Sequence, residues 1–478
     1  MTFASMNFAI FMVILFFVYY IVPKKASWMV LLLGNVVFYY FSGIKGLIFL
    51  LSVIILTYAI GLFISKTKNK GPLIITIFAV IIFVFLMSVM RVGLSSLIMP
   101  VGLSYYSLMC LGYIIDVYRK VIEPEKNILK LMTFISYFPH IIQGPFDDFS
   151  KLSEDMFKPH YFDYDKAANG IIRVAYGLMK KLVLADRIGN IVNLMYENPS
   201  DYTGFTVIMC VILYSFQLYA DFSGYMDIAV GVSNMLGIDI KENFNVPFLA
   251  KSMAEFWRRW HMSLGEWFKN YVFYPVLRTD LCMGIRKKMK QKKNKYLMNV
   301  LPTVIGLFCV WTLIGLWHGF DWNYLIYDWS CGLIIIFSEL MKPVYDKINK
   351  SNTKIFSSKV FDIFRVIRTF ILVTVTFIIF RADTLNSSFT IIKNIFGPFN
   401  FYKGAEYVYW NAYDFFLIMP AFIILIVYDI MKYKGKDPIA MIRKINPIFR
   451  YLIYVIFILY VYVARHSGET VGFAYSIF

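Results

Sequence analysis

Residues 297–319 read LMNVLPTVIGLFCVWTLIGLWHG, a stretch without an acidic or basic side chain until His318. A helix that crosses a bilayer needs about 20 mainly apolar residues. The stretch therefore predicts a spanning helix with a histidine at its end. An ionisable residue at membrane depth is costly and usually faces a cavity or pathway. His318 is thus our first candidate functional residue; the structural alternative is a buried histidine bonded to a neighbouring helix.

Similar apolar runs continue along the chain, whose 478 residues are 59% hydrophobic and only 16% charged. Soluble domains carry about 25% charged residues, so the surplus apolar surface of this chain is expected to face lipid. We expect an all-α polytopic membrane protein with roughly eleven to thirteen hydrophobic helices, including re-entrant or interfacial pieces. The expected segments are 8–22, 28–41, 46–65, 73–90, 98–118, 170–195, 205–236, 297–317, 324–340, 364–380, 415–431 and 449–463.

The net charge of +18 lies in short loops between these segments. Basic loops follow the positive-inside rule of membrane proteins, so we exclude a nucleic-acid partner. Loops 24–25, 65–70, 119–130 and 278–295 are basic, and the intervening loops are nearly neutral. This alternation predicts a multi-pass protein of the cell membrane with both termini on the extracytoplasmic side.

The chain is expected to form one membrane domain over residues 1–478, because it has no internal repeat and no long polar stretch. Its five cysteines are scattered, which indicates neither a disulfide framework nor a metal site. The P-loop, GxGxxG, HExxH and GxSxG motifs are absent from the sequence. Their absence argues against nucleotide-driven transport, Rossmann cofactors, zinc proteolysis and a serine-hydrolase elbow.

Residues 252–269, SMAEFWRRWHMSLGEWFK, have their aromatic residues at helical spacing on one face. This pattern predicts an amphipathic helix in the membrane interface. Ser252 and Glu255 fit a capping box at its start. His261 lies at the edge of the apolar face, where a functional and a merely solvated histidine are equally reasonable interpretations.

Two other regions interrupt the apolar pattern. Residues 137–149, YFPHIIQGPFDDF, predict a broken helix, in which His140 could line a cavity or satisfy released carbonyl groups. Residues 217–245 place Asp221 and Asp227 in an apolar run. Because they are six residues apart, the two aspartates do not share a helix face. We therefore expect them to act as counter-charges for basic residues. The candidate cations are Arg258, Arg259, Lys180 and Lys181. His160 and His466 are in polar sequence surroundings and receive no role.

A series of motifs between residues 99 and 385 resembles the membrane-bound O-acyltransferase family, in the bacterial branch that contains alginate O-acetylation and teichoic acid D-alanylation proteins. The motifs include FPHIIQGP (138–145), GLMKKLVLADR (177–187), QLYADFSGYMDIAVG (217–231), EFWRRWHMSLGEW (255–267), GLWHG (315–319) and FRADTL (380–385). The resemblance implies helices around a central tunnel. It also implies acyl transfer from a cytoplasmic thioester, acetyl-CoA or an acyl carrier protein, with no bound cofactor.

In the family, His318 matches the invariant catalytic histidine, which implies a general base that deprotonates an acceptor hydroxyl. His261 matches the second family histidine, for which we expect a supporting catalytic or orienting role. The last residues, FAYSIF (473–478), resemble a terminal FxYxxF motif of this branch. The resemblance implies that Tyr475, in an extracytoplasmic tail over residues 464–478, relays the acyl group. On composition alone, Tyr475 would be an interfacial aromatic residue.

The expected function is therefore O-acylation of a cell-surface polysaccharide or teichoic acid through an extracytoplasmic esterase-like (SGNH) partner. Acetyl transfer is favoured, and D-alanyl transfer to lipoteichoic acid is the alternative. A transporter or flippase of a lipid-linked intermediate is a more remote alternative that uses the same broken helices without covalent chemistry.

Overall fold

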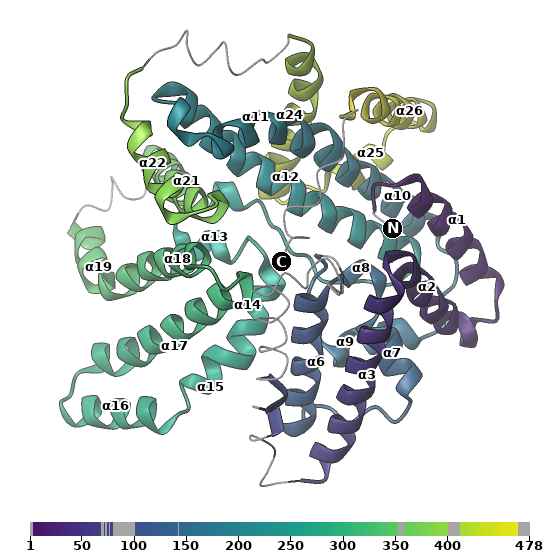
Figure 1. Cartoon of the computed structure of the whole chain (residues 1–478), viewed down its shortest axis with the longest axis horizontal. Coiled ribbons are helices and arrows are strands. Elements are labelled where there is room, and N and C mark those ends of the chain that lie inside the picture. The colour runs from purple at the N-terminus through teal and green to yellow at the C-terminus, as the bar shows by residue number, and fades with distance from the viewer. Residues whose placement is uncertain are drawn as a thin grey trace. The chain divides into compact units, whose positions relative to one another are not determined.

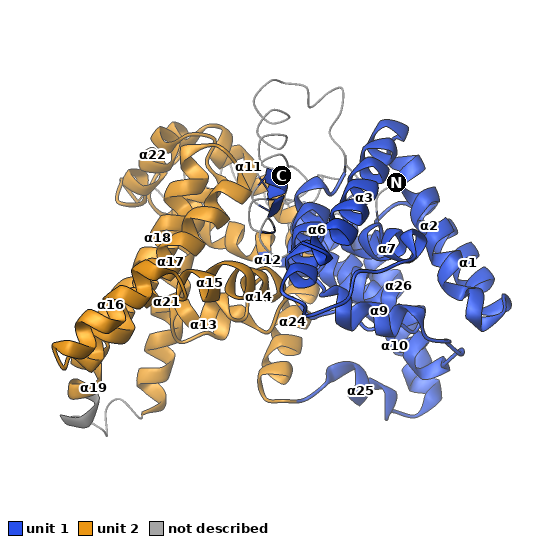
Figure 2. Cartoon of the chain, turned by 90° about the horizontal axis from the view of Figure 1, so that it is seen from below, with its two compact units in different colours: residues 1–186, 219–242, 436–478 blue, residues 187–218, 243–435 orange. Residues whose placement is uncertain are grey.

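The computed structural model describes residues 3–67, 71, 74, 75, 77–79, 101–141, 143–351, 358–399 and 412–466, and these residues are almost entirely helical (Figure 1). In the described part of the chain, the sole extended pairing is an isolated bridge between Phe244 and Trp260. The expected all-α fold is therefore confirmed. The chain forms two compact units (Figure 2).

Unit 1 contains residues 1–186, 219–242 and 436–478. Its helices are α1 (Met6–Ile21), α2 (Ser27–Ser42), α3 (Ile44–Ser65), α6 (Leu103–Tyr118), α7 (Ile128–Ile135), α8 (Phe138–Ile141), α9 (Phe149–Phe157), α10 (Tyr164–Leu178), the π-helix η2 (Met179–Ala185), the second half of α12 (Phe205–Met235), α25 (Pro438–Arg443) and α26 (Pro447–Ala464).

Unit 2 contains residues 187–218 and 243–435. Its helices are α11 (Asp186–Glu197), the first half of α12, α13 (Met253–Trp257), α14 (Met262–Phe268), the π-helix η5 (Lys269–Phe273), α15 (Tyr274–Val276), α16 (Asp280–Gln291), α17 (Lys295–His318), α18 (Trp322–Leu340), α19 (Lys342–Ser351), α21 (Lys359–Arg381), α22 (Leu385–Ile395) and α24 (Ala412–Tyr433). Short 3-10 turns in the chain are η1 (Lys24–Ala26), η3 (Pro199–Asp201) and η4 (Pro247–Leu249).

Six described helices are long and apolar enough to cross a membrane. They are Ile44–Ser65, Phe205–Met235, Lys295–His318, Lys359–Arg381, Asp414–Tyr433 and Pro447–Ala464. A seventh candidate consists of α18 and the start of α19, which meet at a bend of 54°. Several expected segments form shorter helices, such as the 16-residue α1, α2 and α6. The expected segment 170–195 is divided among α10, η2 and α11, and the segment 73–90 lies mostly outside the described residues.

Polar residues at the helix starts explain where many of these helices begin. The side chain of Asn294 accepts a hydrogen bond from the backbone N–H of Leu297 at 3.0 Å, and Ser358 caps α21 in the same way at 3.2 Å. Such caps satisfy N–H groups that the first helical turn leaves without partners. Helix starts are therefore encoded locally, even between strongly apolar runs.

Within unit 1, α10 packs against the second half of α12 through four glycines. A Cβ atom on Gly177 would lie 2.5 Å from the carbonyl oxygen of Gly224, and one on Gly170 would lie 2.5 Å from that of Gly231. The contacts are reciprocal, since Cβ atoms on Gly224 and Gly231 would meet the backbone of α10 at 2.9 and 2.6 Å. Small residues allow membrane helices to approach closely in this manner.

The expected amphipathic helix over residues 252–269 is wrong, because the chain breaks between α13 and α14. His261 has a left-handed φ of 47°, which no continuous helix contains. The expected apolar face is packed inside the protein, with Phe256 and Trp260 each 1% exposed. The capping box is half confirmed: Ser252 accepts from the Glu255 N–H at 3.2 Å, whereas Glu255 accepts from the N–H of Lys251.

Candidate functional site

A hydrogen-bonded histidine and aspartate lie at the turn of the α17–α18 hairpin in unit 2. His318 ends α17, residues 319–321 form the turn, and Asp328 lies in the second turn of α18. Helices α17 and α18 lie side by side (Figure 1). The Nδ1 atom of His318 lies 2.7 Å from Oδ2 of Asp328. The two side chains are 4% and 0% exposed, so the contact is shielded from water. The sequence-predicted candidate is therefore paired with a carboxylate that the sequence analysis missed.

A glycine one turn before His318 permits this arrangement. A Cβ atom on Gly315 would lie 3.2 Å from the Cα atom of Leu325 and 3.4 Å from the Cβ atom of Asp328. Both distances are tight, so a larger residue would push α18 away from α17. The GLWHG motif thus combines the functional candidate with the small residue that brings its partner within hydrogen-bonding distance.

Aromatic rings surround the imidazole of His318. The ring centroids of Trp317, Phe380 and Tyr327 lie 5.2, 5.6 and 6.1 Å from it. An apolar shell of this kind lowers the local dielectric constant and strengthens the hydrogen bond to Asp328. When Nδ1–H donates to Asp328, Nε2 is the nitrogen that can accept a proton. This arrangement has the chemical capacity of a general base.

The second candidate histidine is held by a short segment that precedes it in the chain. The N–H of Met262 donates to the carbonyl oxygen of Asn243 at 3.0 Å, and the N–H of Asn245 donates to that of Arg259 at 2.9 Å. These bonds clamp the residues on both sides of His261. The clamp explains how a non-glycine residue remains at φ 47°, a conformation that normally costs free energy.

The side chain of Asn243 completes this clamp. Its Oδ1 atom accepts from the backbone N–H of Ser263 at 2.9 Å and from the Ser263 hydroxyl at 3.0 Å, and it lies 3.3 Å from Nδ1 of His261. Asn243 lies in the stretch ENFN (242–245), for which no role was predicted from the sequence. The structure therefore connects this stretch to the second histidine.

Burial lowers the pKa of His261 well below its ordinary value of 6.5, and the neighbouring His318 lowers it further. His261 is 4% exposed and lies against the ring of Trp317, at a centroid distance of 6.2 Å. Trp317 thus contacts both candidate histidines. His261 is consequently neutral near pH 7 and can act as a hydrogen-bonding group rather than as a cation.

The two membrane aspartates are counter-charges in unit 1, as expected, for the candidate lysines and, at Asp227, also for Arg173, which lies 3.0 Å away. Lys181 contacts Asp221 at 2.7 Å, and Lys180 contacts Asp227 at 2.6 Å. Arg259 instead pairs with Glu255 in unit 2, at 2.8 Å. The π-helix η2 contains both lysines, each of which is 3% exposed. Buried charges of this kind require close partners, so we assign the cluster to structure.

Two further histidines are buried in unit 1. His140 is 1% exposed, and its Nε2 atom lies 3.1 Å from Oδ2 of Asp147. His160, to which no role was assigned, is 5% exposed, and its Nδ1 atom lies 2.7 Å from the Tyr19 hydroxyl. The predicted tail residue Tyr475 lies outside the described residues.

Comparison with known proteins identifies relatives of the whole central part of the chain. Residues 35–378 match the sequence model of the membrane-bound O-acyltransferase family. A probable alginate O-acetylase of Pseudomonas syringae is 32% identical over 61% of this chain and 51% of its own length. A peptidoglycan O-acetyltransferase of Helicobacter pylori is 26% identical, over 63% and 57%. A teichoic acid D-alanyltransferase of Bacillus subtilis is 31% identical, over 60% and 70%.

The chain thus spans about half the length of the alginate relatives that it matches. The match contains both candidate histidines, His261 and His318, and the clamp residue Asn243.

Proposed function

Because the chain belongs to the membrane-bound O-acyltransferase family, we propose that it transfers an acyl group from a cytoplasmic thioester for O-acylation of a cell-surface polymer. The observation that carries this proposal is the buried hydrogen bond between His318 and Asp328. A histidine oriented by a carboxylate is a recurrent arrangement for removing a proton from a nucleophile. Neither an ion-conducting path nor a flippase requires such an oriented base.

In the proposed step, Nε2 of neutral His318 accepts the proton of the acceptor hydroxyl while the hydroxyl oxygen attacks the thioester carbonyl carbon. The new C–O bond forms and the C–S bond breaks. The departing thiolate takes the proton from the imidazolium, which returns His318 to its neutral form. Asp328 keeps Nδ1–H in place and stabilises the imidazolium between the two proton transfers.

His261 is assigned an orienting role in this step. Its lowered pKa keeps the imidazole neutral, so it can hydrogen-bond to a substrate without adding a second positive charge beside His318. The clamp by Asn243 fixes the direction of its ring. His261 therefore positions a reacting group, and His318 exchanges the proton.

The proposed path of the acyl group crosses the membrane, and the donor is acetyl-CoA or an acyl carrier protein thioester. The basic segment 278–295, most of which forms α16, is proposed to face the cytoplasm, where an anionic donor arrives. Tyr475 is the proposed first acceptor on the extracytoplasmic side. An SGNH or esterase-like partner would then receive the acyl group and pass it to the polymer.

Acetyl is the proposed acyl group, and D-alanyl is the alternative. The relatives with these two activities are equally similar to the chain, at 32% and 31% identity. Intact-mass and peptide mass spectrometry of the protein from cells distinguishes them, since the mass added to the tail peptide differs. A Tyr475→Phe variant, which removes only the hydroxyl, is the matched control.

We expect an acetyl group on Tyr475 in wild type, none in Tyr475→Phe, and loss of polymer acylation in that variant. An added alanyl mass would identify D-alanyl as the transferred group and would leave the proposed reaction class unchanged. Polymer acylation that persists in Tyr475→Phe would contradict the relay.

A further inference from the structure

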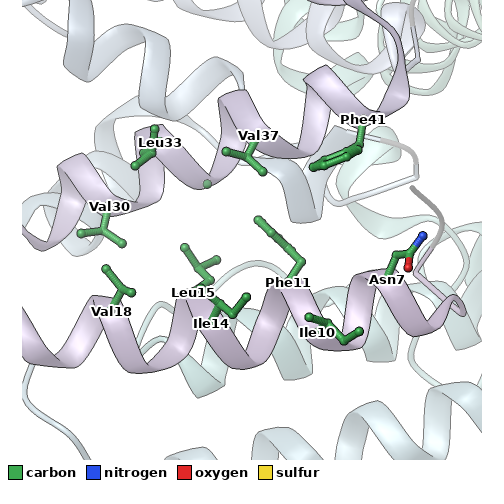
Figure 3. Close-up of a pocket in the computed structure, with 11 residues that line it drawn as sticks. Asn7, Ile10, Phe11, Ile14, Leu15, Val18, Val30, Leu33, Val37 and Phe41 are labelled. Atoms are coloured by element: carbon green, nitrogen blue, oxygen red, sulfur yellow. The ribbon is translucent and has the colours of Figure 1, made fainter.

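An apolar groove runs between α1 and α2 in unit 1, whereas the candidate histidines His261 and His318 belong to unit 2. Its volume is about 520 Å³. Side chains of both helices face the space between them (Figure 3). The lining residues are Asn7, Ile10, Phe11, Ile14, Leu15, Val18, Val30, Leu33, Gly34, Val37 and Phe41. The groove is open on one side, since Ile14 and Leu33 are 59% and 63% exposed.

The dimensions of the groove match one hydrocarbon chain. From Asn7 to Val18 the α1 wall has eleven helical steps, or about 17 Å at 1.5 Å per residue. One leaflet of the hydrocarbon core is about 15 Å thick, half of the whole core. The length of the groove therefore suits one acyl chain.

A glycine in the α2 wall lets the two helices approach closely in the middle of the groove. Gly34 has no side chain, and a Cβ atom there would lie 2.8 Å from Cδ1 of Leu15 on α1. The two helices thus approach closely at this level, while the larger residues above and below form the walls. An acyl chain can lie along the exposed side of this contact.

Two lysines lie where the groove reaches the end of the hairpin. The α1 wall ends at Val18 and the α2 wall begins at Val30, and η1, between these helices, begins with Lys24 and Lys25. Lys24 donates to the carbonyl oxygen of Tyr20, and Lys25 is exposed. Lysines beside an apolar groove at a membrane surface attract anionic lipid headgroups.

We propose that the α1–α2 groove is a binding site for an anionic phospholipid, with one acyl chain between the helices and the phosphate at Lys24 and Lys25. The site combines an apolar channel of one leaflet's length with positive charge at one end. The other end has Asn7, which carries no charge. This inference is independent of the acyl-transfer proposal.

Native mass spectrometry of the full-length protein, titrated with phosphatidylglycerol or with phosphatidylcholine of the same chains, tests the site. Wild type should retain one phosphatidylglycerol in preference to phosphatidylcholine. Lys24→Gln with Lys25→Gln should lower the affinity for phosphatidylglycerol by about fivefold per lysine and leave phosphatidylcholine unchanged. Lys45→Gln, an exposed lysine at the start of α3, is the charge control and should bind as wild type does.

Leu33→Trp fills the groove and should lower the binding of both lipids about tenfold. Met29→Trp adds the same side chain to the exposed surface of α2 outside the groove and is its control. Equal binding of the two lipids by wild type would overturn the proposal, as would unchanged phosphatidylglycerol binding by folded Leu33→Trp. Loss of a co-purifying protein or of a second copy from Leu33→Trp, without loss of lipid, would assign the groove to a protein and also overturn it.

Discussion

The Nδ1 atom of His318 and the Oδ2 atom of Asp328 are 2.7 Å apart, and this contact joins the end of α17 to the start of α18. Both side chains are buried. A buried carboxylate beside a histidine fixes which ring nitrogen carries the proton. The α17–α18 hairpin therefore leaves Nε2 of His318 as the nitrogen that accepts the proton in the proposed transfer.

Asp328→Asn should lower kcat for acyl transfer by about 100-fold or more, because an amide cannot stabilise the imidazolium and favours the wrong tautomer. The KM for the donor should change little, since Asp328 orients His318 and is not proposed to touch the donor. Steady-state kinetics with purified protein measures both constants. Asp321→Asn, in the turn of the same hairpin, retains an α18 cap and is the matched control. A change confined to KM would contradict the orienting role.

His261→Asn and His261→Val should differ in stability by about 1–2 kcal/mol, with the valine variant less stable. Asparagine tolerates the left-handed backbone at φ 47°, whereas a β-branched residue does not. Because both variants lack the imidazole, the difference between their stabilities reports the backbone conformation and not the loss of the ring. Thermal unfolding of the solubilised protein measures the difference. Equal melting temperatures would show that the backbone at residue 261 relaxes on substitution.

Acid should destabilise the protein through His261. Its pKa is lowered below 6.5 by burial, so the folded state keeps the ring neutral where the unfolded chain is already protonated. Below pH 6.5 the unfolded state therefore binds more protons than the folded state. The contribution of the neutral His261 ring to the free energy of unfolding is complete above pH 6.5 and is lost as the pH falls below it, at about 1.4 kcal/mol per pH unit. Melting curves between pH 7.5 and 5.5 should show a shallower pH dependence for His261→Asn than for wild type. Parallel curves would contradict burial of this ring.

Gly224→Leu should destabilise unit 1 by about 2 kcal/mol or more, because its side chain would meet the backbone of Gly177. Gly284→Ala, in α16, is a contrasting glycine control, since a Cβ atom there meets nothing within 4 Å. That change should be neutral or stabilising by up to about 1 kcal/mol, because alanine favours helix. Size-exclusion chromatography after heating reports both effects. A stable Gly224→Leu variant would contradict the close packing of α10 and α12.

The sequence predicts the apolar helices and His318 because length, apolarity and the cost of a buried histidine are local properties. Asp328 could not be found in this way. It lies ten residues after His318, across a turn, and its role depends on how closely Gly315 lets the two helices approach. Only the folded hairpin brings the two residues together.

The prediction of an interfacial helix over residues 252–269 was wrong for a related reason. The periodicity of residues 252–269 is genuine, and its apolar face is buried, but contacts with residues 243–245 impose a left-handed backbone at His261. Tertiary contacts of this kind override a local helical pattern. Conversely, the counter-charge role of Asp221 was correctly predicted from its cost in the membrane, and spacing alone left its partner, Lys181, among several candidates.

The most direct test of the account follows labelled acyl groups from a thioester donor in proteoliposomes that contain wild-type protein or His318→Ala. Wild type should form a covalent acyl ester on the protein or an added hydroxyl acceptor. His318→Ala should insert and bind donor as wild type does, yet form ester at least about 100-fold more slowly, as expected for loss of a general base. Ester formation by His318→Ala at the wild-type rate would contradict the central claim that His318 removes the acceptor's proton.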